Sequence, residues 1–121
     1  MGDRANFGFR DSKGDTVYLY GHWAGHNMLA NLAEAVSAAE PRWQDESYAT
    51  RIAISNLIGD DWAHETGWGL SVDRILDNEH KIPVINWTDK TFTLYEEDLT
   101  TVVYSSTLAE FVQKYSRLVM V

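Results

Sequence analysis

Residues 16–36 read TVYLYGHWAGHNMLANLAEAV, and the pattern of this stretch indicates the class of the fold. Val17 and Leu19 alternate with tyrosines, which is the two-residue period of a β-strand. Gly21 then interrupts the run, and an amphipathic helix follows because apolar residues recur at spacings of three and four. The stretch therefore predicts a strand that turns tightly and leads directly into a helix over residues 25–39.

A second strand is predicted just upstream. Ala5, Phe7 and Phe9 alternate with a polar set that begins at Asn6, the pattern of a strand with one buried face. The DSKGD segment that follows supplies typical turn residues. Residues 4–20 therefore form a predicted β-hairpin.

Three further strands are predicted in the second half of the chain. The segments 69–76, 82–87 and 91–95 are separated by polar turns, and together they predict a three-strand meander. The alternation slips at Arg74, which suggests a bulge. The segment IPVINW is apolar on both faces, as in a central strand, whereas Pro83 favours a strand's start or edge; both placements stay open.

Two more helices are predicted. One starts at Asp45, whose carboxylate is a suitable N-cap, and stops at Gly59, a typical C-terminal cap. Thr107 and Glu110 have the spacing of a capping box, and an amphipathic pattern continues to residue 115. The last residues, LVMV, are apolar, and we expect them to dock on the body of the protein.

The order of elements is therefore ββααβββα. Strands that occur in hairpin runs, separated from the helices, are typical of α+β folds. We predict a two-layer sandwich with a mainly antiparallel five-stranded sheet and helices on one face. The chain has 121 residues and neither an internal repeat nor a linker, so we expect one domain over residues 1–121.

Composition excludes several classes of function. Eighteen acidic and ten basic residues give a net charge of −8, so the protein's field repels nucleic-acid phosphates. The absence of cysteine excludes disulfides, thiolate metal sites and cysteine nucleophiles. No segment approaches the ~20 apolar residues that span a membrane, and the polar start lacks the apolar core of a signal peptide. We therefore expect an acidic cytoplasmic protein.

Four segments are distinctive: GDRAN (2–6), YLYGHW (18–23), GWGLS (67–71) and DNEHKIPVINW (77–87). Together they resemble a group of small uncharacterised proteins encoded by actinobacterial phages and prophages, including those of mycobacteriophages. The resemblance extends over most of the chain. It implies a phage or prophage origin and an accessory role towards the host cell, and it carries over no catalytic residue or cofactor.

Tryptophan is abundant, with five residues in the chain. They fall mostly in turns or at the ends of elements rather than inside helical stripes. Such side chains either plug the ends of a sandwich or form an exposed aromatic patch of the kind that dominates binding interfaces. The five residues are Trp23, Trp43, Trp62, Trp68 and Trp87.

Histidines and carboxylates also suggest a site. Asp60, Asp61 and His64 lie in one loop, where they would suit proton transfer or cation binding. His22 and His26 are four residues apart, but no glutamate follows the first histidine, so the zinc-protease motif is absent. The alternative hypothesis is a small metal-assisted hydrolase or nucleotide-processing enzyme, which requires that these five side chains converge. A solvated loop and a histidine that bonds backbone in a turn explain the same residues.

No catalytic signature is present. Ser105, Ser106 and Thr107 lack the glycine-flanked elbow of a nucleophilic serine, and we expect them to cap the last helix. The leading hypothesis is therefore a non-enzymatic protein that binds a host or phage protein without metal or cofactor. The predicted binding residues are Trp62, Trp68, Asp60, Asp61, His22 and Trp23. Homodimerisation through an exposed sheet edge is compatible with this hypothesis and with the enzymatic one.

Overall fold

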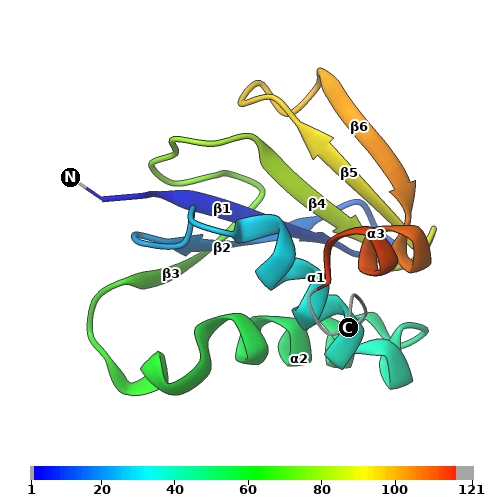
Figure 1. The fold of residues 1–121 in the computed structure, drawn as a ribbon, viewed down its shortest axis with the longest axis horizontal. Helices are drawn as coiled ribbons and strands as arrows, with labels where there is room; N and C mark the ends of the chain where they lie inside the picture. The colour runs from blue at the N-terminus through cyan, green and yellow to red at the C-terminus, as the bar shows by residue number, and fades with distance from the viewer. Residues whose placement is uncertain (1, 117–121) are drawn as a thin grey trace.

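The computed structural model describes residues 2–116 and shows an α+β fold built on a six-stranded mixed sheet. The strands follow the order β3-β2-β1-β4-β5-β6 across the sheet (Figure 1). Neighbouring strands are antiparallel except β1 and β4, which are parallel. The strands are β1 (Ala5–Arg10), β2 (Thr16–Gly21), β3 (Trp68–Val72), β4 (Ile82–Asn86), β5 (Thr91–Tyr95) and β6 (Val102–Thr107). The predicted α+β class and the hairpin of β1 and β2 are confirmed.

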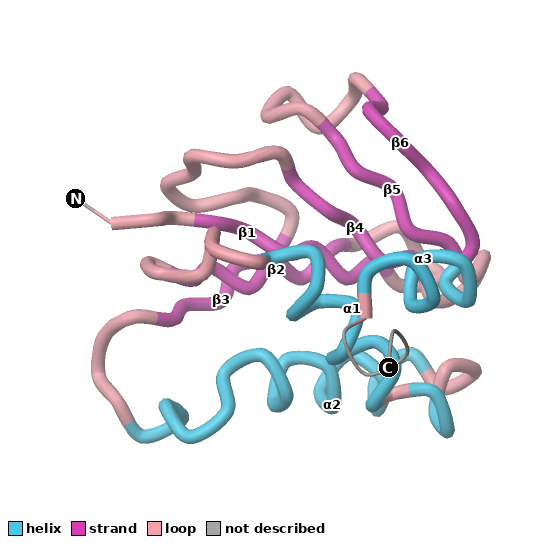
Figure 2. Tube along the Cα trace, viewed as in Figure 1, coloured by secondary structure: helices cyan, strands magenta, loops and turns pink. Residues whose placement is uncertain are grey.

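The α-helices lie together on one side of the sheet, and α1 contacts both of the others (Figure 2). Within the described residues they are α1 (Met28–Ala38), α2 (Glu46–Ile58) and α3 (Leu108–Tyr115), with the short 3₁₀ helices η1 (Glu40–Arg42) and η2 (Gly59–Ala63). Helix α1 begins later than predicted because Asn27 has a φ of 58°, which is left-handed. The LVMV end lies outside the described residues.

The main core fills the space between the sheet and the helices. Phe7 and Phe9, which were predicted to lie on the buried face of β1, are at most 2% exposed, and Leu19 of β2 is fully buried beside them. They belong to one apolar cluster with Leu32 of α1 and Phe111 of α3. The period-two strands and the period-3.6 helix stripes therefore meet as the sequence predicts.

The prediction of five strands was wrong, because β6 adds a sixth. Most β6 side chains are exposed, so the strand has no buried alternating face that would reveal it in the sequence. Ser105 and Ser106 lie within this strand rather than in a helix cap. Thr107 does cap α3, since its hydroxyl accepts from the Glu110 amide and Glu110 accepts from the Thr107 amide.

The predicted three-strand meander was wrong, and the sheet, although mainly antiparallel as predicted, is mixed because it contains one parallel pair. β3 pairs with β2, whereas β4 crosses to the far side of the first hairpin and runs parallel to β1. Alternation identifies strand residues but does not say which strands pair. Pro83 is the second residue of β4 and precedes the three residues that pair with β1, so its missing N–H costs no hydrogen bond to β1. The bulge predicted at Arg74 is absent because β3 ends at Val72.

The loop of residues 73–81 covers part of the sheet face opposite the helices. Asn6 holds this loop, although it is fully buried and was predicted to lie on the polar side of its strand. Its amide donates to the carbonyls of Leu76 and Asp77, and its Oδ1 accepts from the Leu76 amide.

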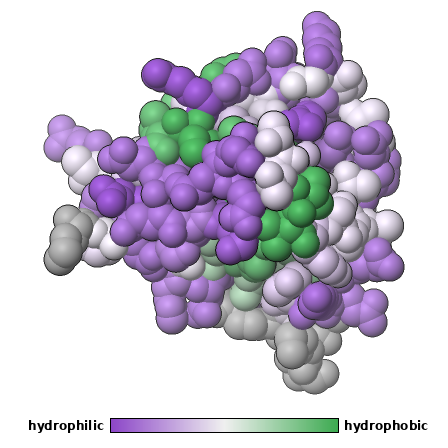
Figure 3. Space-filling view, turned by 90° about the horizontal axis from the view of Figure 1, so that it is seen from above, coloured by the Kyte–Doolittle hydropathy of each residue, from purple (hydrophilic) through white to green (hydrophobic). Residues whose placement is uncertain are grey.

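Seen from above the orientation of Figure 1, the surface is mostly hydrophilic with two hydrophobic patches (Figure 3).

The turn between β5 and β6 depends on Asp98. Its carboxylate accepts from the Thr101 hydroxyl at 2.6 Å and from the Thr101 and Thr100 amides at 2.8 and 2.9 Å. These hydrogen bonds lower the pKa of Asp98 to about 2, and the bond from the Thr101 hydroxyl has the largest effect.

Because this pKa is lowered on folding, we expect the stabilisation of the turn to persist above pH ~4 and to be lost as the pH falls through about 2. The carboxyl ¹³C shift of Asp98 measures this titration directly. Thr101→Val removes the strongest contact and should raise the midpoint. A midpoint that stays unchanged in this variant would contradict the assignment.

Candidate functional site

The candidate site lies at the end of the sheet where β2 leaves it and β3 enters it. The amide of His22 donates to the Gly67 carbonyl at 2.8 Å, which ties the two connections together. A Cβ on Gly21 would lie 2.4 Å from the Ala24 Cβ and 2.8 Å from the Trp68 ring. Glycine is therefore required at position 21 for Trp68 to pack across the strand end.

A hollow of about 660 Å³ opens at this end of the sheet. Tyr20 and His22 form one wall, with the tyrosine hydroxyl 2.9 Å from His22 Nδ1. The Trp23 ring meets the imidazole edge-on, with centroids 4.9 Å apart. The hollow is lined by Tyr20, His22, Trp23, Asp61, His64, Thr66, Gly67 and Trp68.

A second, smaller hollow of about 270 Å³ adjoins the first. It lies between η2 and β3, and its lining is more aliphatic. The two hollows share Asp61, His64 and Trp68, so these residues separate them. The remaining lining residues are Leu19, Ile58, Trp62, Gly69 and Leu70.

Asp61 organises the boundary between the hollows. The indole Nε1 of Trp68 donates to Asp61 Oδ2 at 3.4 Å, and His64 Nδ1 lies 3.3 Å from Asp61 Oδ1. Both partners of the Asp61–His64 pair are about half exposed or more, so solvent screens their interaction. The pair therefore orients side chains more than it stabilises the fold.

Three large apolar side chains around these hollows point into solvent. Trp23 is 69% exposed, Trp62 55% and Leu70 58%. Trp68, in contrast, packs partly against the main core. We call this region the aromatic surface and define it as His22, Trp23, Asp61, Trp62, His64, Trp68 and Leu70.

Five of the six residues predicted to bind a partner line the two hollows. Asp60 does not; it is exposed in η2 beside Asp61. Sequence reasoning missed Tyr20 and Leu70. Both lie on predicted strands, near the strand ends closest to the tryptophan-rich loops. That position was the signal in the sequence that could have identified them as site residues.

The residues of the enzymatic alternative come together only in part. His22, Asp61 and His64 line the larger hollow, whereas His26 and Asp60 line neither hollow. Across residues 2–116, no three histidine or carboxylate side chains are grouped so that they could hold a metal ion. His80, another potential ligand, has its Nε2 2.5 Å from Asp3 Oδ1 and takes part in a different contact.

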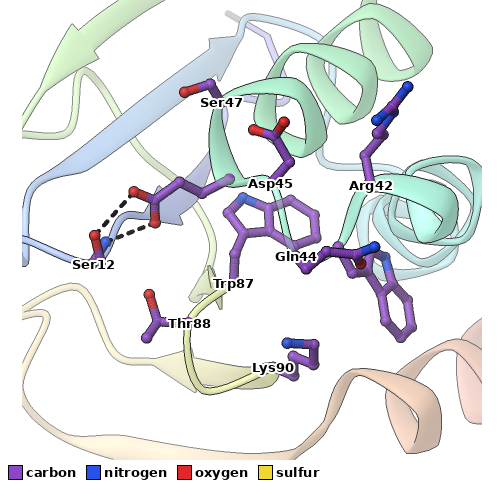
Figure 4. Close-up of a pocket in the computed structure, with 10 residues that line it drawn as sticks. Ser12, Arg42, Gln44, Asp45, Ser47, Trp87, Thr88 and Lys90 are labelled. Atoms are coloured by element: carbon purple, nitrogen blue, oxygen red, sulfur yellow. Dashed lines mark hydrogen bonds between the residues drawn. The ribbon is translucent and has the colours of Figure 1, made fainter.

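Another hollow, of about 740 Å³, lies between the start of α2 and the β4–β5 turn (Figure 4). Arg42 and Lys90 lie around it together with Asp45 and Glu46, so side chains of both charges surround it. The amide and hydroxyl of Ser12 donate to Glu46, at 2.8 and 3.0 Å. Because side chains of both charges surround the hollow, it favours neither an anionic nor a cationic ligand.

Two tryptophans have structural roles. Trp87 is 1% exposed, stacks on Phe9 with ring centroids 6.2 Å apart and donates to the Thr50 hydroxyl. The Trp43 indole donates to the Val36 carbonyl. The tryptophans therefore divide between core packing and an exposed patch.

Comparison with known proteins gives no assignment: no protein-family model, no curated protein and no solved structure matches the chain. Among the helices of residues 2–116, none is long and apolar enough to cross a membrane.

Proposed function

We propose that the protein is a non-enzymatic phage or prophage accessory protein that binds a host or phage protein in the bacterial cytoplasm through the aromatic surface. The phage origin rests on the resemblance of the four sequence segments described above. The binding role rests on the geometry of the sheet end. The two parts of the proposal are independent of each other.

The exposure of Trp23 and Trp62 is the observation that carries the binding role. A tryptophan buries 150–250 Å² when it is covered, and fully burying a large apolar side chain contributes roughly 1.5–3 kcal/mol. The fold gains little from these indoles because they are 69% and 55% exposed. Their apolar area is thus available to a partner, and tryptophan is one of the residues enriched among binding hot spots.

The shape of the site also favours a macromolecular partner. Two adjoining hollows flanked by exposed aromatic side chains form an extended surface rather than one enclosed cleft. Small-molecule sites are usually single concavities that bury most of the ligand. The metal-assisted hydrolase has weaker support because His26 and Asp60 lie outside both hollows.

Capture from an actinobacterial lysate tests the proposal. Trp23→Ala and Trp62→Ala should each reduce capture of a specific partner by roughly tenfold or more, the loss expected of a hot-spot residue. The double variant should abolish detectable capture. Trp68 is unsuitable for this test because it also contributes to the core.

Tyr48→Ala is the matched control. Tyr48 is 54% exposed but lies in the first turn of α2, whereas Trp62 follows the other end of that helix. A 13-residue helix is about 20 Å long, so the two positions are well separated. Capture that survives the double tryptophan variant, or that is lost equally with Tyr48→Ala, would remove the aromatic surface from the proposal.

A further inference from the structure

Among residues 2–116, β3 is an edge strand, and no other described strand pairs with the backbone groups on its outer side. Two hydrogen bonds close its ladder with β2, from Asp73 N to the Thr16 carbonyl and from His22 N to the Gly67 carbonyl, each 2.8 Å long. Backbone groups in an antiparallel strand point alternately to either side. Counting from these two hydrogen bonds, the backbone N–H and C=O groups of Gly69 and Ser71 point toward β2. Those of Trp68, Leu70 and Val72 point outward.

This edge lacks the usual protection against pairing. Natural sheets protect edges with charged residues, prolines or bulges. The strand Trp68–Val72, WGLSV, contains no charged residue and no proline, and its register with β2 is continuous. Leu70 and Val72 are 58% and 64% exposed, and both side chains lie on the same face as the smaller hollow.

The charge beside the edge determines what can pair there. η2 and the residues that follow it carry Asp60, Asp61 and Glu65. Asp73 and the exposed Arg74 flank the other end of β3, so acidic groups outnumber basic ones beside this edge. A second copy of the chain, with its own charge of −8, would bring the same acidic groups to this edge. A basic segment would meet opposite charge, which favours association and increases its rate.

We propose that an extended basic segment of a partner protein adds to the sheet beside β3. Its backbone pairs with the outward groups of Leu70 and Val72, its apolar side chains cover these two residues and Trp62, and its basic side chains lie near Asp60 and Asp61. Strand addition of this kind takes affinity from main-chain hydrogen bonds and specificity from side-chain pockets. The inference rests on the proposed function and specifies the partner's conformation and charge.

Synthetic peptides provide the probe. A short peptide of alternating lysine and valine should slow the exchange of the Leu70 and Val72 amide protons by about tenfold or more at saturation, since these amides gain a partner. Gly69 and Ser71, already paired with β2, should change little. A glutamate–valine peptide should not bind, and N-methylation of the lysine–valine peptide should abolish the protection.

Matched variants of the two edge strands show whether the peptide binds at β3 or at β6, the other open edge of the sheet. Val72→Lys places a charge on β3 and should weaken lysine–valine binding about tenfold or more. Val103→Lys places the same charge on β6, where Val103 is 43% exposed, and should leave binding unchanged. The reverse pattern would overturn the assignment to β3.

Three other outcomes would also overturn the inference, and each is distinguishable from failure of the proposed function. Shifts at the Trp23 and Trp62 indoles without protection of Leu70 and Val72 would leave a binding surface but no strand addition. Protection that appears without peptide and grows with protein concentration would make a second copy the occupant. No response to the peptide at about 1 mM would exclude a basic strand, while the capture experiment would still decide the proposed function.

Discussion

Phe92→Ala is expected to lower the free energy of unfolding by about 3–5 kcal/mol, a large share of the roughly 5–15 kcal/mol that stabilises a typical domain. Phe92 is fully buried and stacks on Phe111 with ring centroids 4.0 Å apart. Tyr104 and Tyr115 contact the same ring. The substitution therefore leaves a cavity where β5, β6 and α3 meet.

Urea unfolding monitored by circular dichroism measures this loss. Phe92→Leu retains most of the side-chain volume and should cost clearly less, about 1.5 kcal/mol or below. Amide exchange should show α3 opening before α1 in the alanine variant, because Phe111 loses its stacking partner. Equal losses for the alanine and leucine variants would contradict the role of Phe92 as a packing centre.

Asn6→Ala is expected to cost about 3 kcal/mol, although it removes only a small polar side chain. The Asn6 amide donates to the Leu76 and Asp77 carbonyls and to Asn78 Oδ1, at 3.4, 3.0 and 3.1 Å. Its loss leaves these groups and the Leu76 amide without their partner, and each buried unsatisfied group costs about 1–3 kcal/mol.

The loop of residues 73–81 should show the effect of Asn6→Ala first. Exchange of the Leu76 amide is expected to accelerate before global unfolding, since Asn6 Oδ1 accepts its hydrogen bond. Asn56→Ala, an exposed position on α2, is the matched control and should change stability by no more than about 0.5 kcal/mol. A Leu76 amide that stays protected in the Asn6 variant would refute the anchoring role.

The sequence predicts individual elements of this fold better than their arrangement. The alternation of Phe7 and Phe9, the helix stripe after Gly21 and the capping box at Thr107 are local patterns with direct structural consequences, and the structure confirms each. The parallel pairing of β1 with β4 depends on how a long connection crosses the first hairpin. No residue pattern within either strand encodes that crossing.

Asn6 and β6 show two further limits of local patterns. Asn6 occupies a polar position in its strand, but a loop some seventy residues later in the chain buries it. Val102 to Tyr104 have strand-forming side chains, yet these stay exposed and leave no periodic contrast between two faces. A local sequence pattern reveals neither the burial of a residue by a distant segment of the chain nor the exposure of a strand at the edge of the sheet.

The candidate site was predictable to a useful extent because its chemistry is concentrated in a few residue types. Tryptophans in loops, acidic residues in one connection and a histidine after a strand end indicated most of the predicted binding residues that line the two hollows. The division into two hollows by Trp68, Asp61 and His64 required the fold, because β2 and β3 meet through non-local pairing.

Site-specific photocrosslinking in an actinobacterial lysate shows whether the aromatic surface contacts a partner protein. A benzophenone amino acid replaces Trp23, Trp62 or, as the control, Tyr48. Positions 23 and 62 are expected to crosslink the same protein, and position 48 is not. Crosslinking of that protein only from position 48, or of unrelated proteins from 23 and 62, would contradict the claim that the aromatic surface is the binding site.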